Sequence, residues 1–460
     1  WSLGLSGEQN QLFADGKVMY EARYPTIDEA STMVRFNYAK AGSSTGFVSG
    51  TNKEKSQLVD PAFKEFATTA DFFDGAKIWM VPGAQWTSLT SSVESYDPSS
   101  GKLVFESTER GKTNKWGYYD PKEGSPYYVY GTYTLLDAEM EWWYDAENQE
   151  IYIKAPNGEN PDTSGVYIEA KKREAALNLS NSSYVNIEGI NTRGATIIID
   201  ENSSHILLKG IKGEYVGHNS DSDAQEDLGV LLKGSFIEVN SCEFSNSSGP
   251  VINVQGSDNR VINSYIHDGN YSGTYAGHAK LSGRRQFISN NTISESGRDV
   301  VSFRQLSESV VQYNDIYGAG HLTLDVGVMY AADTDGQNTL IHHNYIHDNY
   351  TTSHNVGFYP DEMTHNLIVY NNVVYNADTA YQFNQPSLYN LAYNNTGYNT
   401  NVISDDYFAS SVFGDSRGRQ FINNMFNKAE SDKYSPTSTY SKANMNETNK
   451  FADADNGDFR

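Results

Sequence analysis

A short motif repeats down the second half of the chain at intervals that suit only a small unit of structure. Each copy has two or three apolar or aromatic residues, an asparagine, any residue and a further apolar one. The copies read FISNNTI, VVQYNDI, LIHHNYI, LIVYNNVV, NLAYNNT and QFINNMF. Their aligned asparagines are Asn291, Asn314, Asn344, Asn371, Asn395 and Asn424, at intervals of 23, 30, 27, 24 and 29 residues. Weaker copies precede them from about residue 184.

This repeat predicts an all-β fold, a right-handed parallel β-helix. Short β-branched segments with period-two alternation between Gly, Asn, Asp and Ser turns are strand signals. A unit of roughly 20–30 residues lets each coil give one strand to each of about three sheets. Asparagine tolerates left-handed bends and can hydrogen-bond along the stack, so we interpret the asparagine column as scaffold. Leucine-rich repeats and a β-propeller would need patterns that the sequence lacks.

The chain divides into three predicted regions. Residues 1–175 lack the repeat, and EWWYDAENQEIYIKAP reads as two strands around a turn, while LVDPAFKEFA predicts one short helix. We expect this region to be an antiparallel β domain that caps or flanks the coil. Residues 176–430 are the predicted β-helix, and residues 431–460 are a predicted irregular C-terminal coil.

Charge and cysteine content exclude several functions. With 34 basic and 58 acidic residues, the net charge of −24 argues against a nucleic-acid or anionic-membrane partner. The sequence has no apolar run of about 18 residues, so we expect no membrane span. The single cysteine, Cys242, excludes an intrachain disulfide and a Cys-based zinc site, and its apolar surroundings predict a buried thiol. The sequence leaves the oligomeric state open.

Counting ten residues back from successive asparagines brings charged residues into one register, where stacked neighbours lie about 4.8 Å apart. Asp325 and His321 belong to the intervening coil, the longest at 30 residues, which we expect to carry an excursion. Like charges this close are costly unless something uses them. The alternative is that these acids lie in ordinary solvated turns and have no role in function. The column changes from cationic to acidic to amide through Lys280, Arg304, Asp333, Asp335, Asp361, Glu362, Asn384 and Gln385.

Paired carboxyl groups are what cleavage of a glycosidic bond needs. One carboxyl stays protonated and donates to the leaving oxygen, while the other stays ionised as base or nucleophile. A neighbouring negative charge raises the pKa of one member, and a cation such as Arg304 keeps another ionised. The tyrosines Tyr330, Tyr359 and Tyr381 are candidates to line sugar subsites. We expect no metal and no cofactor, because the histidines near residue 343 lie on a stacking face.

The sequence resembles secreted bacterial β-helix carbohydrate enzymes, including glycoside hydrolase families 120, 136 and 141. The likeness spans most of the chain and rests on QNQLFADGKVMYEARYPT, EWWYDAENQEIYIKAPNGENP, LDVGVMY and VGFYPDE. It implies a secreted or periplasmic glycoside hydrolase, and a chain that begins at Trp1 is typical of processing. By this resemblance Asp325 and Asp361 match the catalytic acids, with Asp333 as an alternative partner. Pro360 departs from the pattern, as does Glu362 directly after Asp361.

Two further functions remain open. HAKLSGRRQFISNNTISESGRDVVSFRQ is similar to the Lys- and Arg-bearing coils of β-helix polysaccharide lyases, which implies Lys280 as base and Arg304 as its helper on a uronate-containing glycan. The calcium-binding acids expected upstream of that lysine are missing. A non-catalytic glycan-binding β-helix is the other alternative. In the hydrolase hypothesis Asp333, Asp335 and Glu362 support the two acids. In the same hypothesis the residues that bind the polysaccharide or oligosaccharide are Arg304, Lys280, His321 and Gln385. An algal or sulfated glycan is compatible with the acidic composition.

Overall fold

The computed structural model describes residues 9–28, 31–32, 34–223, 225, 227–384, 386–398, 400, 402–405, 417–426, 439–442 and 445–446. The chain forms two compact units. The first comprises residues 1–174 with the short segments 218–226 and 272–274, and the second comprises residues 175–217, 227–271 and 275–460.

The first unit is built from two sheets whose strands pair antiparallel, apart from the parallel pair β2–β11. The predicted strand–turn–strand segment is confirmed as β11 and β12, and the predicted short helix as α1. The smaller sheet has the order β12 (Glu150–Lys154), β11 (Glu141–Asp145), β2 (Lys17–Glu21), β1 (Leu12–Ala14) and β13 (Ile168–Ala170). The larger sheet contains β3 (Arg23–Tyr24), β10 (Pro126–Tyr130), β7 (Lys77–Met80), β8 (Leu89–Asp97), β9 (Lys102–Glu106), β6 (Lys55–Val59) and β5 (Gly46–Phe47), with β4 (Ala39–Lys40) beside β10. The three short helices are α1 (Phe63–Phe66), α2 (Glu109–Thr113) and α3 (Pro161–Ser164).

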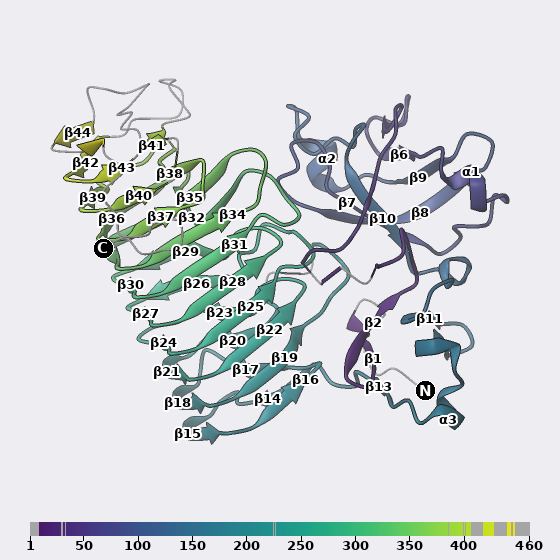
Figure 1. The fold of residues 1–460 in the computed structure, drawn as a ribbon, viewed down its shortest axis with the longest axis horizontal. Helices are drawn as coiled ribbons and strands as arrows, with labels where there is room; N and C mark the ends of the chain where they lie inside the picture. Colours follow the sequence, from purple (N-terminus) through teal and green to yellow (C-terminus); the bar gives the residue numbers. More distant parts are fainter. Residues whose placement is uncertain are drawn as a thin grey trace. The chain divides into compact units, whose positions relative to one another are not determined.

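The second unit is a right-handed parallel β-helix, which confirms the predicted fold class. Successive coils give strands in turn to three parallel sheets, here named sheets I, II and III (Figure 1). Sheet I consists of β14 (Ala175–Asn178), β17 (Thr196–Ile199), β20 (Val230–Leu232), β23 (Ile252–Val254), β26 (Ala279–Arg284), β29 (Val301–Ser307), β32 (Val326–Ala332), β35 (Asn355–Pro360), β38 (Thr379–Gln382) and β41 (Val402–Asp405).

Sheet II consists of β15 (Ser183–Glu188), β18 (Ser204–Lys209), β21 (Ser235–Asn240), β24 (Arg260–Ile262), β27 (Phe287–Ser289), β30 (Val310–Gln312), β33 (Thr334–His342), β36 (Thr364–Tyr370), β39 (Leu391–Tyr393), β42 (Arg419–Ile422) and β44 (Thr439–Lys442). Sheet III consists of β16 (Asn191–Arg193), β19 (Lys212–Gly217), β22 (Glu243–Ser247), β25 (Tyr265–Gly269), β28 (Thr292–Ser296), β31 (Asp315–Ala319), β34 (Tyr345–Asn349), β37 (Val373–Tyr375), β40 (Thr396–Tyr398), β43 (Met425–Phe426) and β45 (Met445–Asn446). Of the predicted C-terminal coil, 431–460, the described residues are those of β44 and β45.

A column of buried asparagines runs along the corner between sheets II and III. The backbone N–H and Nδ2 of Asn314 donate to Oδ1 of Asn344 at 3.1 and 2.9 Å, and Asn344 donates to Asn372 in the same way at 3.0 Å. The residue before each member has left-handed backbone angles, for example His343 with φ 55°. The scaffold role is confirmed, but the predicted register is wrong at one coil, because Asn372 rather than Asn371 joins the column.

The inside of the coil is a continuous apolar column that extends from Ile197 to Phe421. It contains Cys242, which is a free and buried thiol as the sequence predicted. Inward-facing side chains of three sheets meet there, so every coil removes apolar surface from water. No helix among the described residues has the length and apolar character that a membrane span requires.

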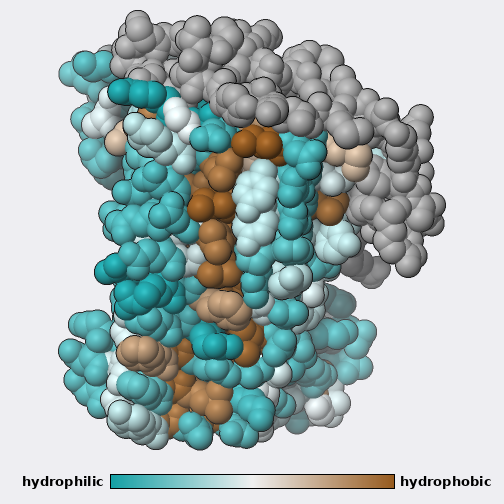
Figure 2. All heavy atoms as spheres, turned by 90° about the vertical axis from the view of Figure 1, so that its left-hand side faces the viewer, coloured by the Kyte–Doolittle hydropathy of each residue, from teal (hydrophilic) through white to brown (hydrophobic). Residues whose placement is uncertain are grey.

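The outer face of sheet II carries a second apolar row, which is half-buried rather than enclosed. Figure 2 shows apolar side chains gathered in a band along the coil axis. Beside this row, His342, Tyr370 and Tyr393 form a ladder with ring centroids 4.6 and 5.0 Å apart. By strand register the apolar row contains Phe287, Val310, Leu340, Ile368 and Leu391.

Candidate active site

Asp325 lies at the turn that leads from sheet III into β32 of sheet I. Its backbone has φ 59°, a left-handed conformation that aspartate tolerates better than most residues. The backbone N–H of Asp325 donates to the Ser353 carbonyl at 3.0 Å, and Nη1 of Arg298 donates to the Asp325 carbonyl at 3.2 Å. The neighbouring coils therefore fix the backbone of Asp325 on both sides.

Asp361 follows the last residue of β35 and receives two side-chain hydrogen bonds. The hydroxyl group of Tyr330 donates to Oδ2 at 2.7 Å, and Nδ2 of Asn384 donates to Oδ1 at 2.7 Å. Hydrogen bonds to a carboxylate are charge-assisted and stronger than neutral ones. Three consecutive coils thus position this carboxyl group.

Tyr359 links the two aspartates. Nδ2 of Asn384, which bonds Asp361, also donates to the Tyr359 hydroxyl oxygen at 2.8 Å. The same hydroxyl group interacts with the Asp325 carboxyl group and acts to lower its pKa. The structure therefore brings Asp325 and Asp361 together through Tyr359 and Asn384, although they belong to different coils.

Burial raises the pKa of Asp325 above the ordinary value of an aspartate. The positive charge of Arg298 and the nearby His354 oppose that rise, while the negative charge of Asp361 adds to it. Oδ1 of Asp325 is buried and has no hydrogen-bond partner among the described residues. An uncompensated buried oxygen favours the protonated carboxyl group.

The two tyrosines of the site remain hydrogen-bond donors. Burial raises the pKa of Tyr330 and of Tyr359 well above the usual value for a phenol, and the charge of Asp361 raises both further. Both side chains are almost inaccessible, at 8% and 4% exposed. They therefore act here as donors to the carboxyl groups rather than as open stacking platforms for a sugar ring.

A buried ion pair next to the acids was not among the residues predicted from the sequence. Arg298 and Asp299 lie in the turn before β29, with Nε and Oδ2 3.4 Å apart and both side chains at most 3% exposed. Burial raises the pKa of Asp299 to about 6, and Arg298 opposes that shift. The signal in the sequence was the adjacent pair of opposite charges in the otherwise small and apolar stretch SGRDVV.

The predicted cations lie on the outer face of sheet I. Lys280 is in register with Ser302, which is in register with Tyr330, so the three belong to one outward row across β26, β29 and β32. Arg304 is more exposed and pairs with Asp333, with Nη1 and Oδ2 3.5 Å apart and side chains 46% and 63% exposed. A pair this exposed contributes little to stability, so Arg304 is available to a ligand.

The other predicted acids are arranged less closely. The backbone N–H of Asp333 donates to the carbonyl of Glu362 at 3.0 Å, which makes these two neighbours at the corner between sheets I and II. Burial, followed by the charges of Asp361 and Asp333, raises the pKa of Glu362. Asp335 lies further along β33, where it is exposed and accepts from Asn366 at 2.8 Å. The five predicted acids therefore do not form one cluster. Asp325 and Asp361 are connected through Tyr359 and Asn384, Asp333 and Glu362 lie at the corner, and Asp335 is exposed.

Three further residues, His321, Gln385 and Tyr381, were predicted to contact the sugar. His321 bonds Glu295 at 2.7 Å and stacks on a tyrosine, in the loop between β31 and β32. Gln385 lies outside the described residues. The prediction that Tyr381 lines a sugar subsite is wrong, because its ring points into the coil, is 1% exposed and packs against Phe358 at 6.3 Å.

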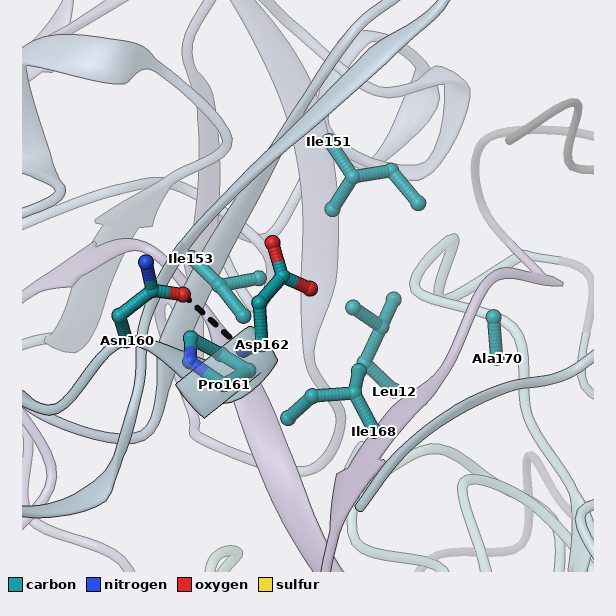
Figure 3. A pocket seen from close by; sticks show the side chains of 8 residues that line it. All are labelled: Leu12, Ile151, Ile153, Asn160, Pro161, Asp162, Ile168 and Ala170. Carbon is teal, nitrogen blue, oxygen red and sulfur yellow. Dashed lines mark hydrogen bonds between the residues drawn. The ribbon is translucent and has the colours of Figure 1, made fainter. Parts of the chain in front are cut away.

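A cavity of about 250 Å³ in the first unit offers different chemistry (Figure 3). Asn160 there accepts a hydrogen bond from the backbone N–H of Asp162 at 3.0 Å. Among the described residues that line it, Asp162 alone is ionisable, so the cavity does not supply an acid–base pair. The lining residues are Leu12, Ile151, Ile153, Asn160, Pro161, Asp162, Ile168 and Ala170.

A second hollow of about 480 Å³ lies at the corner between sheets II and III. Its charged residues, Lys212 and Glu243, lie 2.9 Å apart and satisfy each other. Within the described part of the chain, no group of three or more His, Cys, Asp and Glu side chains is arranged to hold a metal ion. Asp325, which precedes β32, and Asp361, which follows β35, are therefore the strongest candidates for acid–base chemistry.

Comparison with known proteins agrees with the architecture. A family model described as "Right handed beta helix region" matches residues 212–328, a range that includes strands β19 to β31 and Asp325. A search of curated protein sequences finds no match. The chain thus contains a right-handed β-helix region.

The solved structures to which this chain is similar include the following three. One described as "Glycoside hydrolase" is 12% identical, with a TM-score of 0.41, and the match covers 96% of this chain and 78% of that one. XylC in complex with xylose is 11% identical, with a TM-score of 0.32 over 88% and 74% of the two chains. The GH87 α-1,3-glucanase from Streptomyces thermodiastaticus strain HF3-3 is 10% identical, with a TM-score of 0.29 over 95% and 97%. The assignment of chemistry therefore rests on the residues of the site.

Proposed function

We propose that the protein is a glycoside hydrolase in which Asp325 is the proton donor and Asp361 is the base or nucleophile. The observation that carries this proposal is the connection between the two carboxyl groups: Asn384 donates to both Asp361 and Tyr359, and Tyr359 and Asp361 both act on the pKa of Asp325. Glycosidic cleavage requires two carboxyl groups whose surroundings keep one protonated and the other ionised.

The surroundings of Asp325 favour a protonated carboxyl group, whereas those of Asp361 favour an ionised one. Burial raises the pKa of Asp325, and the negative charge of Asp361 acts in the same direction. Asp361 receives donors on both carboxyl oxygens, from Tyr330 and Asn384, and each of these stabilises an ionised carboxylate, whereas Oδ1 of Asp325 has none among the described residues. This asymmetry is the reason for giving the donor role to Asp325.

The reaction then follows from these two states. Asp325 gives its proton to the glycosidic oxygen as the bond to the anomeric carbon breaks, so the leaving group departs as an alcohol. The carboxylate of Asp361 either attacks the anomeric carbon or removes a proton from an attacking water. If Asp361 attacks, a water deprotonated by Asp325 then hydrolyses the bond between Asp361 and the sugar, which returns the proton to Asp325 and frees Asp361. If Asp361 deprotonates water instead, proton exchange with solvent restores both carboxyl groups.

The substrate we infer is an anionic polysaccharide or oligosaccharide. Arg304 is exposed beside the site, and Lys280 lies on the outward row that leads to Tyr330. Guanidinium and ammonium groups suit sulfate or carboxylate substituents on a sugar. A secreted or periplasmic location, which gives such an enzyme access to a polysaccharide, stays a prediction.

Digestion of a panel of neutral, uronate-containing and sulfated polysaccharides tests the proposal. We expect new reducing ends without new absorbance near 235 nm. An increase in that absorbance would show unsaturated ends and would select the lyase, with Lys280 in place of the two acids. Binding without any new chain ends would contradict both catalytic hypotheses and select a glycan-binding β-helix.

A further inference from the structure

Arg298 lies next to Asp325 and Tyr330 and is 2% exposed. Its guanidinium group lies 4.9 Å from the ring centroid of Tyr275 and 5.5 Å from that of Tyr330. Nη1 donates to the backbone carbonyl of Asp325, and Nε faces the carboxylate of Asp299 at 3.4 Å. One buried cation therefore contacts the backbone of one acid and the ring that positions the other.

The two contacts act on different parts of the site. The bond to the Asp325 carbonyl holds a residue whose left-handed backbone would otherwise relax, since an extended conformation costs less for an L-residue. The cation–ring contact holds the Tyr330 ring, and the hydroxyl group of that ring donates to Asp361 at 2.7 Å. Displacement of the guanidinium group would move both carboxyl groups.

The charge of Arg298 is maintained despite its burial. Burial opposes it, but Asp299, the two tyrosine rings and Asp325 more than compensate, so that the pKa of Arg298 is raised. Asp299 also accepts a hydrogen bond from the Gly327 backbone N–H at 3.2 Å, which keeps its carboxylate aimed at the cation. A buried charge without such a partner would be costly.

We propose that Arg298 is the positioning residue of this active site, and that Asp299 holds it in place. This inference rests on the proposed function for its catalytic meaning, but its geometry can be tested without a substrate. A misplacement of about 1 Å in a catalytic group can cost on the order of 100-fold in rate.

The variant that tests the proposal is the double substitution Arg298→Met with Asp299→Asn. Removal of Arg298 alone would leave the Asp299 carboxylate buried without a partner and could unfold the coil. The double variant removes both charges and keeps similar volumes. The side-chain amide that replaces the Asp299 carboxylate would still offer an oxygen to the backbone N–H of Gly327. Arg298→Lys is the conservative companion, because it keeps the charge and loses the planar group that lies over the rings.

The first readout is titration of the Asp325 carboxyl by carbon-13 NMR of aspartate-labelled protein, with Asp325→Asn used for assignment. Arg298 and His354 lower its pKa, whereas burial and Asp361 raise it. The charge of Asp299 repels that of Asp325, so Asp299→Asn alone is the reference that isolates Arg298. The double variant should titrate at higher pH than Asp299→Asn, and Arg298→Lys close to the wild type. Equal midpoints in the double variant and Asp299→Asn would overturn the proposal, whether or not a glycan is cleaved.

The second readout is kinetic and applies once a substrate is in hand. The double variant should lose about 100-fold in kcat with KM within about 3-fold of wild type, because positioning acts on the reacting groups. The alkaline limb of its pH profile should lie at higher pH than that of Asp299→Asn. A fall in kcat with the Asp325 titration unchanged would reduce Arg298 to a structural role and overturn the proposal.

A matched control comes from sheet II. Arg260 also lies 4.9 Å from a ring, that of Phe287, and pairs with Glu238 at 3.3 Å. The double substitution Arg260→Met with Glu238→Gln removes the same kinds of contact away from sheet I. It should leave the Asp325 titration and kcat at wild-type values, and an equal effect there would contradict the specific role given to Arg298.

Discussion

Replacement of Asn372 by alanine tests the scaffold of the coil quantitatively. Oδ1 of Asn372 accepts from the backbone N–H and from Nδ2 of Asn344, both at 3.0 Å. Its Nδ2 donates to the Ile341 carbonyl at 2.9 Å and to Oδ1 of Asn395 at 3.0 Å. All four bonds are buried, and at about 1 kcal/mol net for each their loss should cost about 4 kcal/mol of unfolding free energy.

Chemical denaturation and differential scanning calorimetry measure this loss. At roughly 2 °C per kcal/mol for a large domain, the Tm of the β-helix should fall by about 8 °C. The control is Asn371→Gly, one residue earlier, where the side chain is exposed and φ is 53°. Glycine adopts that conformation without strain, so the control should change stability little. If the two variants lie within about 1 kcal/mol of each other, the buried ladder does not stabilise the coil as argued.

Three further outcomes concern the site. The activity should fall as pH rises through the raised pKa of Asp325, because the donor loses its proton, so the alkaline limb of kcat/KM should lie above the ordinary range of an aspartate. A limb at the usual value would contradict this. Asn384→Ala should lower kcat by about 10- to 150-fold, since a hydrogen bond to the charged Asp361 contributes about 1.5–3 kcal/mol. Unchanged kcat in a folded variant would exclude that role. Arg304→Ala and Lys280→Ala should raise KM for an anionic glycan and leave kcat nearly constant, and an equal KM on neutral and anionic glycans would argue against them as binding groups.

The sequence predicts the coil well because each coil has to satisfy the same buried contacts. A ladder asparagine makes up to four hydrogen bonds, so the residue type recurs wherever the stack continues. Where two asparagines are adjacent, the pattern leaves the choice between them open, and at Asn371 and Asn372 the prediction took the wrong one. The first takes the left-handed bend and the second enters the stack, and periodicity alone does not separate these roles.

The site was only partly predictable for a related reason. Counting back from the asparagines puts Asp361 in the register of Arg304, and the strand pairing agrees: Arg304 pairs with Ala332, and Ala331 pairs with Pro360, which precedes Asp361. It misplaces Asp335, because β33 shifts register between Asp335 and Thr339 and displaces that acid toward solvent. Arg298 could not be found by counting, since its burial depends on coils that lie above and below it.

The most direct test of the central claim compares Asp325→Asn and Asp361→Asn with the wild type on the glycan that the wild type cleaves. Asp258→Asn is the control, because Asp258 shares φ 59° with Asp325 but pairs with Arg285 at 2.7 Å, away from sheet I. The account predicts that both site variants keep their fold and lose at least about 1,000-fold in reducing-end release, while the control keeps wild-type turnover. Wild-type turnover in either folded site variant would contradict it.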